Sequence, residues 1–346
     1  MFRHRRTALA VSLAGTLAAL TGVAHAAERN FTLTGDALKI TTPCAKSVHI
    51  TTAAGGHTIR IQAMAEDQGE VDQLTSTTSG ATAQLGATSQ RCYRRGNRDW
   101  NDWQPTLEIE IAVPAGIPLE IKESGSTDYV ADGDYGATVL TLDGSGDVKG
   151  GSIKGGIQVQ SRGSGDVALD RLDGALTLRS LGSGTLAIDQ MTGPALDLEI
   201  SGSGNVTLHG GSVGPATVKL SGSGDVQLPA VASLRLVAHG SGDTEVERVQ
   251  GALSADLAGS GSLAIRSVTA PTAVLNQSGN GDVTIDGGTI GTLTAAITGS
   301  GEATIMGTVT DAAVSLSGSG DMHIAAVTGH MNKTGGGSGT LHVDGH

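Results

Sequence analysis

Residues 201–225 read SGSGNVTLHGGSVGPATVKLSGSGD and contain one complete unit of a repeat. A serine flanked by glycine returns every 18, 19 or 20 residues from Ser126 to Ser338, with Asn280 in its place once. Twelve such corners fill the last two-thirds of the chain. A fixed period of this length indicates a solenoid, in which each coil buries its apolar face only against its neighbours.

Aliphatic and polar side chains alternate within the unit. Val206 and Leu208 share one face while Thr207 lies on the other, and residues 216–220 repeat this order. A period of two is typical of a β-strand with one buried face. Two short strands and two corners account for nearly the whole repeat, and parallel crossovers are right-handed. The sequence therefore predicts an all-β fold: a right-handed parallel β-helix, or two-sheet β-solenoid, of about 12 coils of 19–20 residues with an N-terminal β cap.

The chain divides into three predicted segments. Residues 1–26 have the features of a signal peptide: arginines at the start, an apolar stretch over 7–20 and a small-residue cleavage site at 24–26. Residues 27–120 lack the corner series, and we expect them to form β-strands that cap the open edge of the first coil. Residues 121–346 are predicted to form the solenoid with its Gly-Ser-Gly-Asp corners.

The N-terminal region contains both cysteines and the most unusual segment of the chain. In an oxidising compartment we expect Cys44 and Cys92 to form a disulfide. Residues 91–103 gather both tryptophans and four arginines in an otherwise acidic protein. We favour a pinned loop whose tryptophans seal the first coil. The alternative is a binding surface, because Trp and Arg are frequent binding anchors; its candidate residues are Arg94, Arg95, Arg98, Trp100 and Trp103.

The corner residues have a structural interpretation. Glycine permits the tight bend, and stacked serines can hydrogen-bond to the turn or to one another. In eight coils the residue after the corner is acidic or Asn, which can accept turn N–H groups as an Asx-type cap. The alternative is that stacked carboxylates, such as those of Asp282, Glu302 and Asp321, bind Ca²⁺ and stabilise the scaffold.

Two histidines, His323 and His342, take the same outward position in adjacent coils. With Asp321 nearby they can begin a metal site, but the sequence identifies no firm third ligand. We therefore interpret them as exposed strand histidines, and we expect neither a bound metal ion nor a cofactor.

No arrangement of residues predicts catalysis. No nucleophile-elbow motif places a serine beside a base, and paired carboxylates follow from the repeat itself. Residues 136–346 contain no Phe, Tyr or Trp, whereas a groove that cleaves polysaccharides is expected to use aromatic platforms. We predict a non-enzymatic protein. The alternatives are a β-helical polysaccharide lyase or hydrolase and a Ca-stabilised scaffold.

The net charge and the hydropathy of the chain limit the classes of partner that it is expected to bind. The formal net charge of −12 disfavours nucleic acid, because no basic run neutralises a series of phosphates. No stretch after the predicted leader is long enough for a membrane helix, so we expect no membrane insertion once the leader is removed. We expect a periplasmic or extracellular protein whose partner is an envelope glycan or protein. Self-association, if present, is expected through the C-terminal end of the solenoid.

Residues 107–346 resemble the family of auto-transporter adhesin heads that carry the head GIN domain. The resemblance rests on residues 113–119, VPAGIPL, which lead into repeated corners such as Gly144-Ser145-Gly146-Asp147. It implies a bacterial, exported β-helical domain with a role in adhesion. The family pattern contains no catalytic residues, so the resemblance implies none here.

Overall fold

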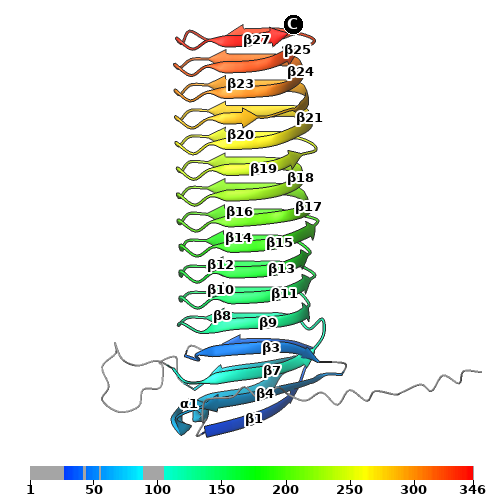
Figure 1. Cartoon of the computed structure of the whole chain (residues 1–346), viewed down its shortest axis with the longest axis vertical. Coiled ribbons are helices and arrows are strands. Elements are labelled where there is room, and N and C mark those ends of the chain that lie inside the picture. The colour runs from blue at the N-terminus through cyan, green and yellow to red at the C-terminus, as the bar shows by residue number, and fades with distance from the viewer. Residues whose placement is uncertain (1–26, 42–43, 54–55, 89–104, 346) are drawn as a thin grey trace, which may run out of the picture.

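Two ladders of parallel strands run along a rod of stacked coils (Figure 1). The computed structural model describes residues 27–41, 44–53, 56–88 and 105–345. In each coil the chain passes from a strand of the first ladder through the Gly-Ser-Gly corner to a strand of the second ladder. It then turns again and enters the next coil. The predicted two-sheet parallel β-solenoid of about 12 turns is confirmed.

Short strands occupy one ladder each. Those of the first ladder are β8 (Leu119–Glu123), β10 (Thr138–Leu142), β12 (Ile157–Ser161), β14 (Leu176–Ser180), β16 (Leu196–Ile200), β20 (Leu253–Leu257) and β26 (Met331–Thr334). Those of the second are β9 (Asp128–Tyr135), β11 (Val148–Lys154), β13 (Val167–Asp173), β15 (Leu186–Gly193), β19 (Thr244–Val249), β22 (Val283–Ile285), β25 (Met322–Val327) and β27 (Leu341–Gly345).

Longer strands continue through the position of the second turn and so join the two ladders. They are β17 (Val206–Leu220), β18 (Val226–Ala238), β21 (Leu263–Gln277), β23 (Gly288–Ile297) and β24 (Ala303–Leu316). In β17 the first residues pair with β15 and the last with β16. The sequence predicts two separate strands here, but main-chain pairing with the neighbouring coils extends through the bend.

The N-terminal region contributes to the stack as well as covering it. Strands β2 (Ala37–Thr41) and β3 (Ser47–Ala53) pair in parallel with β8 and β9, and thus form a coil of the solenoid. On their other side lie β6 (Thr82–Ala87) and β7 (Glu108–Pro114), also parallel. The coil of β2 and β3 therefore lies between two coils that follow it in the chain, and residues 115–118 pass this inserted coil on their way to β8.

Antiparallel strands cover the N-terminal end of the rod. β1 (Ala27–Thr34) pairs with β4 (Thr58–Ala65), β4 pairs with β7, and β5 (Leu74–Ser79) pairs with β6. The short helix α1 (Gln68–Asp72) connects β4 to β5 and is capped by the Asp67 side chain. These elements lie at the lower end of the rod in Figure 1. Because β7 pairs with β3 on one side and with β4 on the other, the end coil has no unpaired strand edge at β7.

The alternating pattern places the aliphatic side chains inside, as predicted. Val206, Leu208, Val218 and Leu220 are each at most 2% exposed. One buried column runs the length of the rod, because each coil aligns its residues with the equivalent residues of the next coil. The described core of the repeats is thus built from stacked aliphatic side chains.

The corner glycines are required by stacking more than by bending. Gly222 and Gly224 do not have a positive φ angle. A Cβ atom on Gly222 would overlap the carbonyl oxygen of Gly202, and one on Gly224 would overlap that of Gly204. Successive corners therefore lie too close for any side chain between them, which explains why both glycine positions persist through the repeats.

Candidate functional site

The Gly-Ser-Gly corners form a continuous row of hydroxyl groups along one edge of the rod. The main-chain N–H of Ser223 donates to the carbonyl of Gly202 in the preceding coil, at 3.2 Å. The Ser223 hydroxyl lies 3.2 Å from that of Ser203, and the Ser221 hydroxyl lies 3.0 Å from that of Ser201. All four serine side chains are exposed. The edge thus presents one row of corner serines held by main-chain bonds, and Ser201 and Ser221 form a second pair of serines beside that row.

The acidic residues beside these corners bond to the next coil. Oδ1 of Asp225 accepts the main-chain N–H of Asp243 at 2.9 Å, and Oδ1 of Asp282 accepts that of Glu302 at 2.8 Å. Where the column has Asn205, its side-chain oxygen accepts from Asp225 in the same way, at 2.8 Å. The predicted capping role holds with one difference: the N–H group belongs to the following coil and not to the acid's own turn.

A cavity lies where the N-terminal strands meet the first corners. Its volume is about 400 Å³, and polar side chains of the hairpin β5–β6 and of the coils around β8 surround it. The lining includes Lys39, Thr75, Thr77, Gln84 and Lys122. The Lys39 ammonium is paired with Glu120, and Asp143 also lines the cavity. The Lys122 ammonium and several hydroxyls suit a polar ligand, since they offer hydrogen-bond donors in a concave site.

Shallow hollows continue from this cavity along the corners. The cavity and the first hollow share Asp143, and the first and second hollows share Gly202 and Ser203. The second hollow reaches as far as Ser260. We call this continuous surface, from Lys39 to Ser260, the serine track.

An ion pair crosses the serine track near its start. Arg162 donates two hydrogen bonds to the carboxylate of Asp143, at 2.8 and 3.0 Å. The hydrogen bonds from Arg162 hold the pKa of Asp143 below its ordinary value. Leu181 follows in the next coil and is 63% exposed. The track therefore changes from charged to apolar to hydroxyl-lined over successive coils.

The binding residues predicted from composition cannot be compared with this surface. Arg94, Arg95, Arg98, Trp100 and Trp103 lie outside the described residues. In the sequence, this segment follows β6, whose residues Gln84–Ala87 line the cavity. Its role in binding stays a prediction.

The predicted disulfide and signal peptide also stay predictions. Cys44 is 8% exposed, but Cys92 lies outside the described residues, as do residues 1–26. Within the part of the chain that the structure describes, no helix is long and apolar enough to cross a membrane.

The structure brings the two predicted histidines together and adds a third residue. His323 and His342 are register partners on β25 and β27. Asp344 contacts both imidazoles, whereas Asp321 accepts the main-chain N–H of Thr340 at 2.6 Å. The sequence reasoning missed Asp344. The signal was its spacing of two residues from His342 on a strand, which places both side chains on one face.

Comparison with known proteins confirms the resemblance seen in the sequence. Residues 158–267 match the family described as "Putative auto-transporter adhesin, head GIN domain". This segment covers the central coils and most of the serine track. The match is to these coils alone and spans less than half of the chain. No curated protein matches the chain.

Several solved structures are similar to the chain at low identity. A putative adhesin from Parabacteroides distasonis is 13% identical, with 92% of this chain and 97% of that chain covered and a TM-score of 0.36. A putative adhesin from Parabacteroides merdae is 14% identical, with coverage of 91% and 95% and a TM-score of 0.28. A putative cell adhesion protein from Clostridium sporogenes is 14% identical, with coverage of 69% and 99% and a TM-score of 0.22.

Proposed function

We propose that the chain is an exported, non-enzymatic, adhesin-like module that binds an extended envelope polysaccharide along the serine track. The observation that carries this proposal is the continuity of the track from the Lys39 cavity to Ser260. The corner serines, which repeat once per coil along the track, match the repeated hydroxyls of a polymer better than they match a small ligand. The adhesin-like family of the central coils supports the same class of function.

The corner carboxylates support a binding role over a catalytic one. Asp225 and Asp282 each accept a main-chain N–H group from the following coil at Oδ1, so one oxygen of each carboxylate already stabilises the fold. A general acid or nucleophile needs a carboxyl group that can reach the scissile bond. Glycan cleavage by the purified chain would contradict the proposal.

Binding can be tested with purified residues 27–346 and whole bacterial cells. We expect the chain to bind cells, and we expect periodate oxidation of the cell-surface sugars to abolish binding while protease treatment leaves it intact. The opposite pattern would indicate a protein partner and would overturn the glycan assignment. Failure to bind any envelope fraction would overturn the whole proposal.

Variants can locate the binding surface. The double variant Ser203→Arg and Ser223→Arg places two bulky side chains on the track, at exposed positions that should not disturb the core. The control variant has Gln227→Arg and Asn276→Arg instead, at exposed residues of β18 and β21. We expect loss of cell binding in the first variant only. Equal binding by both would show that the track is not the site.

Export is part of the same proposal. Adhesin-like family membership suggests an exported or surface protein. We expect an antibody against the solenoid to find the protein in the periplasm, on the surface of intact cells, or in the medium. Recovery of the protein only from the cytoplasm would contradict this assignment.

A further inference from the structure

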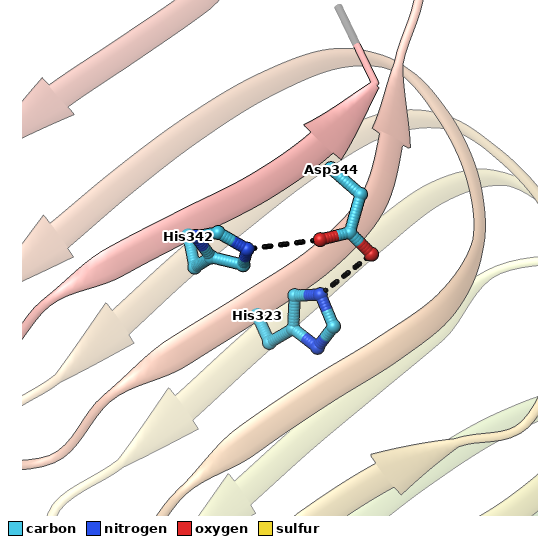
Figure 2. A group of neighbouring side chains, drawn as sticks. All are labelled: His323, His342 and Asp344. Atoms are coloured by element: carbon cyan, nitrogen blue, oxygen red, sulfur yellow. Dashed lines mark hydrogen bonds and ion pairs between the residues drawn. The ribbon is translucent and has the colours of Figure 1, made fainter.

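The last two strands of the second ladder bring two imidazoles and one carboxylate together. His323 on β25 and His342 on β27 have ring centroids 5.2 Å apart. Oδ2 of Asp344 lies 2.9 Å from Nε2 of His323, and Oδ1 lies 2.9 Å from Nε2 of His342 (Figure 2). The three side chains come from neighbouring coils and point toward one another.

We propose that His323, His342 and Asp344 bind a divalent transition-metal ion, with Zn²⁺ as the preferred ion. The three ligand atoms all lie within 4.8 Å of one another. Zn²⁺ binds imidazole nitrogen and carboxylate oxygen at about 2.0–2.2 Å, in tetrahedral geometry. Binding requires the imidazoles to exchange their contacts with the Asp344 carboxylate for contacts with an ion between the three atoms. Three protein ligands leave a fourth position for water.

The other ion pairs between His and Asp in the described part of the chain lack this arrangement. Each of these pairs has a single imidazole: His49 with Asp132, His57 with Asp36, His209 with Asp189, and His330 with Asp311. Among the described residues, only the group around Asp344 brings three metal-binding side chains this close. The distinguishing feature is that two imidazoles from adjacent coils converge on one carboxylate.

The donor set favours a transition metal over Ca²⁺. Imidazole nitrogen is a good ligand for Zn²⁺, Cu²⁺ and Ni²⁺, whereas Ca²⁺ takes six to eight oxygen ligands. The site offers two nitrogens and one carboxylate. This metal site is therefore distinct from the stacked corner acids, which were the sequence-based candidates for Ca²⁺.

A bound ion would join β27 to β25 through their side chains. β27 pairs with β25 and with no other described strand, so main-chain bonds hold it on one side alone. A metal bridge across this pair would resist the opening of the outermost described coil, because binding to the folded state stabilises that state.

Zinc titration of the metal-free, tag-free mature chain tests the proposal. We expect calorimetry at pH 7.5 to show one equivalent of Zn²⁺. His323→Ala and His342→Ala should each weaken binding by at least about 100-fold, since even outer-shell changes cost about 10–100-fold. His209→Ala removes an exposed histidine that also pairs with an aspartate, and serves as the matched control. It should bind as the wild type does.

Hydrogen exchange provides a second measurement on the same samples. We expect Zn²⁺ to slow exchange of the β27 amides in the wild type and in His209→Ala, but not in His342→Ala. Absence of zinc binding, or equal affinity in His342→Ala and the wild type, would overturn the proposal.

Discussion

The main-chain N–H of Asp166 donates a hydrogen bond to Oδ1 of Asp147, 19 residues earlier in the chain and 2.9 Å away. Asp147 itself donates in the same way to Asp128 at 3.0 Å, and Thr185 donates to Asp166 at 2.7 Å. Each side-chain oxygen thus bonds to the coil that follows it. The acidic column is part of the ladder that holds successive corners together.

Removing one acid of this column should loosen the next corner. Asp225→Ala leaves the N–H of Asp243 without its side-chain acceptor, and we expect a loss of about 1 kcal/mol in the free energy of unfolding. Asp225→Asn should lose much less, because Asn205 already fills this role in the preceding coil. Urea unfolding of both variants measures the difference. Equal stability of the Ala and Asn variants would show that the hydrogen bond is unimportant.

A methyl group at a corner glycine should be far more damaging. In Gly222→Ala the new Cβ would overlap the main-chain carbonyl of Gly202, and neither backbone can move without separating the coils. We expect a loss of more than about 3 kcal/mol, since overpacking against side chains alone costs about 1–3 kcal/mol. Thermal unfolding followed by circular dichroism measures this loss of stability.

Gly287→Ala is the control for this substitution. Gly287 has no positive φ angle, and a Cβ there would meet no atom within 4 Å. We expect its melting temperature to match that of the wild type. A similar loss in both variants would indicate a general effect of replacing glycine and would contradict the stacking explanation.

Glu123 should make stability depend on pH. Its side chain is buried beside the first corner and accepts the N–H groups of Gly125 at 2.5 Å and Gly144 at 3.1 Å. Burial raises the pKa of this carboxyl above its ordinary value of 4.5. Because the folded-state pKa is raised, the stability that the protonated Glu123 carboxyl contributes is fully present below pH 4.5. This stability is lost as the pH rises through the folded-state pKa.

The amide variant Glu123→Gln removes this titration while keeping one acceptor oxygen. We therefore expect it to gain stability relative to the wild type as the pH rises from acidic to neutral values. Urea midpoints of both proteins at a series of pH values measure the change. A constant difference between them would contradict the predicted effect of burial.

Tyr135 should show a pH effect at the alkaline end. Its hydroxyl donates to the carbonyl of Ile50 at 2.8 Å and so joins β9 to the inserted coil. Burial raises the pKa of this phenol above its ordinary value of 10.0. The unfolded chain therefore ionises first, and stability present below pH 10.0 is lost as the pH rises further.

The variant Tyr135→Phe separates the effect of the hydrogen bond to Ile50 from the effect of phenol ionisation. At pH 8 it should be less stable than the wild type by about 1 kcal/mol, because the Ile50 carbonyl loses its donor. Above pH 10 the difference should shrink, since Phe does not ionise. Urea unfolding at both pH values measures it. A difference that stays constant would show that Tyr135 ionises alike in the folded and unfolded chain.

Local sequence patterns were sufficient to predict the structure of the repeat. The corner spacing and the alternation of Val206, Thr207 and Leu208 predicted the parallel two-sheet solenoid and its buried column. Both patterns recur in most coils, so one repeat is enough to predict the next. The shared outward position of His323 and His342 followed from the same period.

The order of the coils and the contacts between neighbouring coils could not be predicted from local sequence patterns. The stacking order decided that β2 and β3 lie between later coils, and that the oxygen of Asp147 reaches Asp166. It also aligned the hollows of the serine track and set Asp344 between two histidines. The sequence by itself determined the shape of one coil, because alternation and turns are local. Only the tertiary structure decided which coils touch, because contacts between distant residues depend on how the coils stack.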